Sequence, residues 1–283
     1  MTPYKLVGAY ASPYSRKMRA VLRYRRVPFR WISRGGRDDV DIPAVPVALI
    51  PVLVTPGTPD VAMIDSTFQI RHLETRHSER SVVPPDPAVA FLDALVEDFA
   101  DEWLTKAMFH YRWAYAADAA KASRVLPCDQ MLDLPPDQLA RGGAAFAERQ
   151  IGRLAVVGSN AATAPLIEAS YRRLLAILDA AIQRRPFCFG RRPSAGDFAL
   201  FGQLSQLAAF DPTSAALAAE HAPRVVAWVN LMDDLGGSEV TADDWSPRGR
   251  VAEDLAPLFA EIGRGFAPFL LANADALATG ARE

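Results

Sequence analysis

The sequence of 283 residues has few cysteines and no excess of charge of one sign. Its two cysteines, Cys128 and Cys188, show no paired spacing, and its four histidines lack the close spacing of a metal site. The 31 basic residues are balanced by 33 acidic ones, so no overall positive field would attract nucleic acid. We therefore expect neither a metal site nor a nucleic-acid partner.

Long hydrophobic runs are also missing. Apolar stretches such as residues 266–272 are far shorter than the roughly 18 to 20 residues that a membrane-spanning helix needs. The N-terminal residues lack the apolar core of a secretion signal. The sequence predicts a protein without a membrane span, and the two unpaired cysteines favour the reducing cytoplasm.

Two common catalytic motifs are absent as well. There is no glycine-rich phosphate loop and no Gly-x-Ser-x-Gly nucleophile elbow, which argues against nucleotide and serine-hydrolase chemistry. Half of the residues are hydrophobic, as in folded proteins with large cores. Because the length exceeds that of a usual single core, we expect two domains.

The first part of the chain alternates between strand-like and helix-like patterns. Branched and aromatic runs indicate strands, a Pro/Gly turn indicates a hairpin, and apolar residues at helical spacing indicate amphipathic helices. The expected order is strand, helix, strand, hairpin and helix, over residues 4–10, 13–25, 28–32, 51–55 with 61–64, and 65–76.

The chain then changes character at a proline-rich segment. Three prolines between residues 84 and 87 favour a stiff connector. Beyond it, residues 89–117, 136–156 and 165–184 show helical periodicity without a convincing alternating strand. We predict domains at residues 1–83 and 88–283, joined by a linker over residues 84–87.

Two further local patterns concern helices. Ser194 and Asp197 have the spacing of a capping box, which predicts the start of a deeply apolar helix. Six basic residues crowd the first predicted helix, and we interpret them as a solvated helix face. They are Arg16, Lys17, Arg19, Arg23, Arg25 and Arg26.

The segment Ser12-Pro13-Tyr14-Ser15 lies where the first strand turns into the first helix. It is similar to the Cys-Pro-Tyr-Cys of glutaredoxins, with both sulfur atoms replaced by hydroxyls. Disulfide exchange requires an attacking thiolate, so this site cannot perform it.

The same segment, continued by Arg-Lys-Met-Arg, resembles the opening of the first helix in Ser-type glutathione transferases. Ile50-Pro51-Val52-Leu53 resembles the cis-proline element of that family, Asp65-Ser66 its acidic-serine pair, and Ser194–Phe198 its helical capping box. The resemblance extends over residues 4 to about 205. It implies an α+β thioredoxin-like domain followed by an all-α domain, in a cytoplasmic homodimer.

The resemblance also implies roles for particular residues. Ser12 would donate a hydrogen bond to the thiol of glutathione, which is a cosubstrate, and no other cofactor is expected. The backbone at Ile50 and a cis Pro51 would hold the cysteinyl part, while Asp65 and Ser66 would bind the γ-glutamyl end. As an alternative, Ser12 and the Asp65-Ser66 pair are only helix caps.

Some features depart from the family pattern. Leu49 stands where many members carry Lys or Gln to hold the glycine carboxylate, and the helical domain is unusually long.

Tyr14, Phe109 and Trp113 are candidates for an electrophile pocket, although such aromatics also occur in cores and dimer interfaces. We therefore predict conjugation of glutathione to a small hydrophobic electrophile, or alternatively a non-catalytic binding protein of the same fold.

Overall fold

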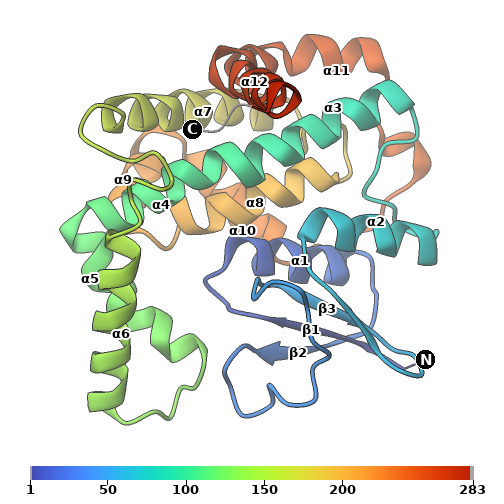
Figure 1. The fold of residues 1–283 in the computed structure, drawn as a ribbon. Coiled ribbons are helices and arrows are strands. Elements are labelled where there is room, and N and C mark those ends of the chain that lie inside the picture. Colours follow the sequence, from blue (N-terminus) through green and yellow to red (C-terminus); the bar gives the residue numbers. More distant parts are fainter. Residues whose placement is uncertain (1, 281–283) are drawn as a thin grey trace.

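A four-stranded mixed sheet forms the N-terminal part of the computed structural model, which describes residues 2–280 (Figure 1). The strand order is β2-β1-β3-β4, with β2 parallel to β1 and the other neighbours antiparallel. Helices α1 and α2 lie between the sheet and the helical part of the chain. The bounds are β1 Tyr4–Gly8, α1 Pro13–Tyr24, β2 Phe29–Ser33, β3 Val52–Thr55, β4 Val61–Met63 and α2 Ser66–Arg76.

These elements follow from the local sequence. Alternation buries Leu6 and Val7 on opposite faces of the central strand, and each face has its own cluster of apolar side chains. Helix α1 begins with a serine cap and a proline at its first position, which are the residues preferred there. All six predicted elements are present, and their ends differ from the prediction by at most two residues.

The rest of the described chain is helical. Within residues 2–280, no strand follows β4, so the prediction of an α+β part followed by an all-α part is confirmed. The bounds are α3 Pro87–Asp98, η1 Phe99–Leu104, α4 Thr105–Ala114, α5 Ala116–Val125, η2 Leu126–Asp129, α6 Pro136–Ile151, α7 Ala164–Arg184, α8 Ala195–Leu207, α9 Pro212–His221, α10 Pro223–Asp233, η3 Ala242–Asp244, α11 Arg248–Asp254 and α12 Ala256–Thr279.

The first helical segment departs from the prediction of one continuous helix over residues 89–117. It begins at Pro87, the last residue of the predicted linker, because Asp86 caps the helix and proline is tolerated at the first position. It then changes to a π-helical segment, η1, before α4 continues. Tyr115 adopts an extended conformation and ends α4, so α5 starts as a separate helix.

Helix α8 is buried along its whole length and supports the first domain. The predicted capping box is confirmed, since Ser194 and Asp197 exchange side-chain and backbone hydrogen bonds. Helix α1 packs directly on α8, and Gly202 is required at the crossing. A Cβ atom at Gly202 would lie 2.6 Å from the carbonyl oxygen of Pro13. The N-terminus of α1 is therefore fixed against α8.

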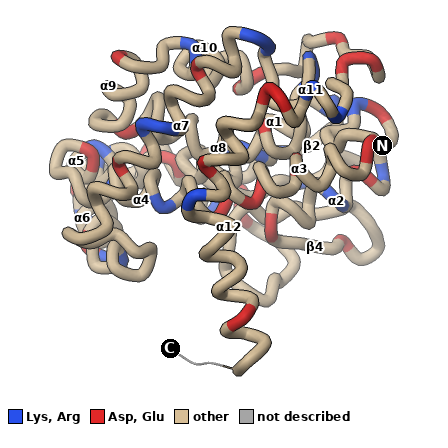
Figure 2. Tube along the Cα trace, turned by 90° about the horizontal axis from the view of Figure 1, so that it is seen from above, with Lys and Arg blue, Asp and Glu red and all other residues tan. Residues whose placement is uncertain are grey.

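Basic and acidic residues are interspersed along the chain, and the C-terminal half of α12 projects from the body (Figure 2). Within residues 2–280, no single helix is long and apolar enough to cross a membrane. Helices α11 and α12 reach that length and composition only as a pair, across a bend of 66°.

Candidate functional site

Three loops converge at one end of the sheet. Val7 near the end of β1 pairs with Val52 at the start of β3, and Leu53 pairs with Met63 at the end of β4. This register places the turn into α1, the Ile50–Pro51 bond and the start of α2 beside one another. The candidate residues for binding glutathione therefore share one edge.

Ser12 is the N-cap of α1. Its Oγ accepts a hydrogen bond from the backbone N–H of Ser15 at 3.3 Å, while its own N–H donates to the Ala9 carbonyl at 3.1 Å. The side chain is half-buried, and capping uses the oxygen but not the hydroxyl hydrogen. Ser12 thus caps the helix and retains a donor for a ligand.

The neighbouring hydroxyls of α1 are less accessible than that of Ser12. Ser15 is fully buried, and its Oγ accepts the backbone N–H of Ala9 at 3.3 Å. The Tyr14 hydroxyl donates to the Asp101 carbonyl at 2.8 Å and lies 3.3 Å from Thr105 Oγ1. Burial raises the pKa of Tyr14 to about 12. Tyr14 therefore contacts the helical part rather than presenting an ionisable hydroxyl to the site.

The Ile50–Pro51 peptide bond is cis, as the family resemblance implies. Gln69 on α2 fixes this segment, since its Nε2 donates to the carbonyl oxygens of Pro51 at 2.8 Å and Met63 at 3.0 Å. One amide side chain thereby joins α2 to β3 and β4 at the edge where Ile50 lies.

Asp65 and Ser66 open α2. Asp65 Oδ1 accepts the backbone N–H groups of Thr67 at 2.9 Å and Phe68 at 3.4 Å, with Asp65 itself in the left-handed region at φ 73°. Ser66 is buried, and its Oγ accepts a hydrogen bond from Lys17 Nζ at 3.1 Å. Because the oxygen accepts from an ammonium, the Ser66 O–H is a stronger donor.

Lys17 joins the start of α2 to the helical domain. Its ammonium is fully buried and also donates to Glu97 Oε1 at 2.7 Å and Asp101 Oδ2 at 2.6 Å. Burial alone would lower the pKa of Lys17, but the two carboxylates outweigh it and raise the pKa. Thr67 Oγ1 adds a donor to Glu97 at 3.0 Å.

The interpretation of the basic residues on α1 as a solvated face is wrong for Lys17 and Arg25. Both are buried, and Arg25 pairs with Glu74. Lys17 precedes Val21 and Tyr24 by four and seven residues, which puts it on the buried face of the helix. That spacing was the available signal, together with carboxylates four residues apart at positions 97 and 101.

Leu49 is 54% exposed, and two arginines in the preceding loop are each paired with an acidic residue. Arg34 pairs with Asp39 at 3.3 Å, and Arg37 pairs with Asp133. From the helical part, Asp129 Oδ2 accepts the backbone N–H of Ala11 at 2.8 Å. The 126–133 segment therefore borders the turn that precedes Ser12.

Two of the aromatic residues predicted to line an electrophile pocket, Phe109 and Trp113, lie close to each other on α4. Trp113 is buried and packs against Phe146 of α6, with ring centroids 5.7 Å apart, and Phe109 lies 6.4 Å from Trp113. Trp113 therefore belongs to the packing of α4 against α6, which is the core alternative. His110 is also satisfied, since its ring nitrogens contact Ser159 at 2.8 Å and Glu168 at 3.3 Å.

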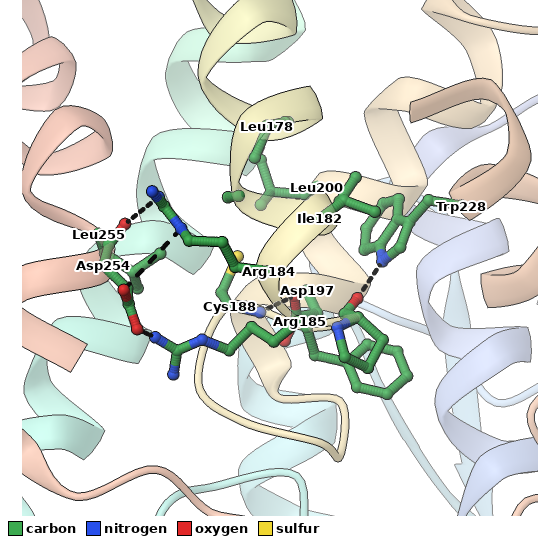
Figure 3. Close-up of a pocket in the computed structure, with 13 residues that line it drawn as sticks. Leu178, Ile182, Arg184, Arg185, Cys188, Asp197, Leu200, Trp228, Asp254 and Leu255 are labelled. Carbon is green, nitrogen blue, oxygen red and sulfur yellow. Dashed lines mark hydrogen bonds and ion pairs between the residues drawn. The ribbon is translucent and has the colours of Figure 1, made fainter. Parts of the chain in front are cut away.

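A separate small cavity lies where α7 leads into α8 (Figure 3). Its volume of about 20 Å³ has room for about one water molecule. Arg184 and Arg185 pair with Asp254 at its edge, and burial raises the pKa of the Cys188 thiol well above its ordinary value. The Cys188 thiol at this cavity is therefore neutral, and the cavity is too small for a substrate. Among residues 2–280, no cluster of three or more His, Cys, Asp or Glu side chains could hold a metal ion.

Two family models match this chain. Residues 6–81 match the N-terminal domain of glutathione S-transferases, and residues 138–231 match their C-terminal domain, which together make up more than half of the chain. The chain belongs to the glutathione S-transferase family. The first match begins within β1, extends beyond α2 and includes all of the candidate glutathione-binding residues.

Solved structures with this transferase fold are distant in sequence. A glutathione S-transferase from Methylobacterium radiotolerans, in complex with glutathione sulfonate, is 20% identical with a TM-score of 0.50, covering 87% of this chain and 97% of that one. One from Rhodospirillum rubrum is 17% identical with a TM-score of 0.49, covering 89% and 99%. At such identities the first similarity supports the fold alone. The comparison with curated proteins found no match.

The Lys17 network predicts a large loss of stability in Lys17→Met. At neutral pH this change leaves Glu97 and Asp101 buried without their cation, which costs about 3–5 kcal/mol of the free energy of unfolding. Arg30→Met is the control, because the Arg30–Asp38 pair is exposed and is expected to contribute at most about 1 kcal/mol. Denaturant unfolding measures both, and equal small losses would contradict the account.

The same network predicts a pH dependence. Burial raises the pKa of Asp101 to about 6, despite the opposing effect of Lys17. The folded chain therefore holds a proton between about pH 4 and 6 that the unfolded chain has lost, so this contribution to stability is full below about pH 4 and disappears as pH rises through about 6.

Wild type should lose up to about 3 kcal/mol of stability relative to Asp101→Asn between pH 4 and 7. Unfolding curves at a series of pH values measure this difference. Asp137→Asn, at an exposed pair on α6, provides the matched control. A difference between wild type and Asp101→Asn that does not change with pH would rule out the proposed titration.

Proposed function

We propose that this chain binds glutathione at the edge formed by Ser12, Ile50, Pro51 and Ser66, and that it conjugates the thiol to a small hydrophobic electrophile. The observation that carries the proposal is the convergence of both helix N-termini on one sheet edge, with Ser66 held by the buried Lys17. Each helix start offers hydrogen-bond donors suited to the anionic parts of glutathione.

Ser12 would act on the sulfur atom. A free thiol with a pKa near 8.5 is only a few per cent thiolate at neutral pH, so catalysis must stabilise the anion. The Ser12 O–H and the positive end of the α1 dipole would both do so. The thiol proton passes to water, the thiolate forms a carbon–sulfur bond, and the displaced electron pair leaves with the leaving group.

The start of α2 would receive the γ-glutamyl end. The Ser66 O–H, strengthened by Lys17, would donate to the α-carboxylate. Asp65 uses only Oδ1 to cap the helix, and its Oδ2 makes no hydrogen bond within residues 2–280, so it would accept from the α-ammonium. The backbone of Ile50 would pair with the cysteinyl part. No counterpart is proposed for the glycine carboxylate beside Leu49.

The domain roles follow from this assignment. Residues 1–83 would form the glutathione-binding domain and residues 88–283 the helical domain that holds the electrophile, joined by residues 84–87. A cytoplasmic homodimer stays a prediction from the family resemblance.

A second candidate function is a non-catalytic binding protein of this family. It is favoured by the exposed Leu49, by the paired states of Arg34 and Arg37, and by Asp129, which occupies the Ala11 N–H beside Ser12. These features would weaken recognition of the glycine end and narrow access to the sulfur position.

A binding experiment tests whether this chain recognises glutathione. Calorimetric titration should show one site per chain, and Ser66→Ala should weaken it about tenfold or more because a hydrogen bond to a charged group is lost. Ser78→Ala, at an exposed serine after α2, should bind like wild type. Wild type that does not bind glutathione would refute the proposed function.

Turnover tests the role of Ser12. With glutathione and chlorodinitrobenzene as substrates, Ser12→Ala should lower kcat/KM about 100-fold. Loss of a single hydrogen-bond donor to an anion in other enzymes has an effect of this size. Glutathione affinity should change much less, because the donor acts on the sulfur. Activity equal to that of Ser78→Ala would leave Ser12 as a cap only, and wild type that binds without turnover would favour the second candidate function.

A further inference from the structure

A pair of helices, α5 and α6, carries a short segment to the edge of the sheet where the candidate site lies. Helix α5, η2 and the first residues of α6 lie between the two ranges that match the family models. The pair extends from the end of α4 along the side of the molecule (Figure 1). Ala122 of α5 and Ala147 of α6 are buried in one apolar cluster, and Leu126 of η2 packs against it. This packing fixes the position of η2.

Asp129, at the end of η2, contacts the turn that leads into α1. Its Oδ2 accepts the backbone N–H of Ala11, the residue directly before Ser12, at 2.8 Å. Two hydrogen bonds within the turn are longer, since the Ser12 N–H donates to the Ala9 carbonyl at 3.1 Å and the Ala9 N–H donates to Ser15 Oγ at 3.3 Å. A carboxylate is also a stronger acceptor than a neutral oxygen. The helical part of the chain therefore supplies the shortest of these three contacts.

The residues after η2 contact a second loop, the one that follows β2. Gly36 approaches the backbone so closely that a Cβ atom there would lie 3.0 Å from the Gln130 carbonyl oxygen. Arg37 pairs with Asp133, and both side chains are exposed. Because β1 and β2 are parallel neighbours, the turn after β1 and the loop after β2 leave the sheet at the same edge. The segment after α5 thus bridges two loops at the edge that carries the candidate site.

We propose that Asp129 is a positioning residue for the conjugation of glutathione, because its carboxylate holds the turn from which the Ser12 hydroxyl reaches the sulfur atom. This role rests on the proposed function, in which Ser12 donates to the thiolate. A misplacement of about 1 Å can lower an enzymatic rate about 100-fold, so a fixed turn matters for a donor that acts on one atom. The positioning depends on the acceptor oxygen, since a negative charge close to the sulfur atom would disfavour the thiolate.

Turnover with glutathione and chlorodinitrobenzene compares Asp129→Ala, which lacks the acceptor, with Asp129→Asn, which keeps an acceptor oxygen without the charge. At saturating glutathione, Asp129→Ala should lower kcat/KM for chlorodinitrobenzene about tenfold and weaken glutathione binding by no more than about threefold, because the contact positions a donor to the sulfur atom. Asp129→Asn should retain about half or more of the wild-type kcat/KM, since its amide oxygen can accept the same N–H. Asp137→Ala is the control at an exposed pair on α6 and should behave like wild type.

Two further measurements separate positioning from a general loss of stability. The pKa of the bound thiol, followed by the ultraviolet absorbance of the thiolate, should be about one unit higher in Asp129→Ala than in Asp129→Asn, which corresponds to about tenfold less thiolate. Both variants lack the charge, so this comparison isolates the acceptor. Amide hydrogen exchange of Ala11, measured by NMR without ligand, should be slow in wild type and in Asp129→Asn. It should be about tenfold faster in Asp129→Ala, because the N–H then lacks its acceptor.

Unchanged melting temperatures show that the variants are folded, and Asp129→Leu, which also lacks an acceptor, replaces Asp129→Ala if that variant does not fold. Equal kcat/KM in Asp129→Ala and wild type would overturn the proposal, as would an equal loss in Asp129→Asn. A higher kcat/KM in Asp129→Ala would also overturn it, because Asp129 would then obstruct access to the sulfur atom. These three results leave the proposed function standing, whereas wild type that neither binds nor conjugates glutathione would overturn both.

Discussion

The buried ammonium of Lys17 is the contact on which the candidate site depends. It donates to Ser66 from α2 and to Glu97 and Asp101 from the first helical segment, so one side chain joins three elements. Removing a cation and two carboxylates from water is costly, and their mutual attraction and hydrogen bonds offset this cost. The position of Ser66, and with it the start of α2, is thus tied to the helical domain.

The N-terminus of α1, which carries Ser12, is fixed by close packing against α8. Gly202 allows the backbone of α8 to approach Pro13, which sets the position of the α1 N-terminus and therefore of Ser12. The groups that we propose to activate the sulfur and to bind the carboxylate are held by contacts that also join the two domains. We expect glutathione affinity and the stability of the domain interface to change together in variants of this region.

Local patterns in the sequence predicted the elements around the site well. The strands, the hairpin, the cap at Ser12 and the capping box at Ser194 depend on neighbours within a few residues, so each segment carries its own signal. The burial of Lys17 depends on carboxylates about 80 positions away in the sequence, whereas its charge alone suggested solvent exposure. The π-helical η1 and the break at Tyr115 were missed for a similar reason, since helical periodicity continues through both. Trp113 packs in a core because Phe146 of α6, which is distant in the sequence, lies against it.

The central claim is that the sheet edge with Ser12 and Ser66 binds glutathione. A crystal structure of the chain grown with glutathione tests it most directly. We expect the γ-glutamyl carboxylate to bind Ser66 Oγ and the sulfur atom to lie within hydrogen-bond distance of the Ser12 hydroxyl, with Lys17 still contacting Ser66. Glutathione bound elsewhere, or a sulfur atom directed away from Ser12, would contradict it.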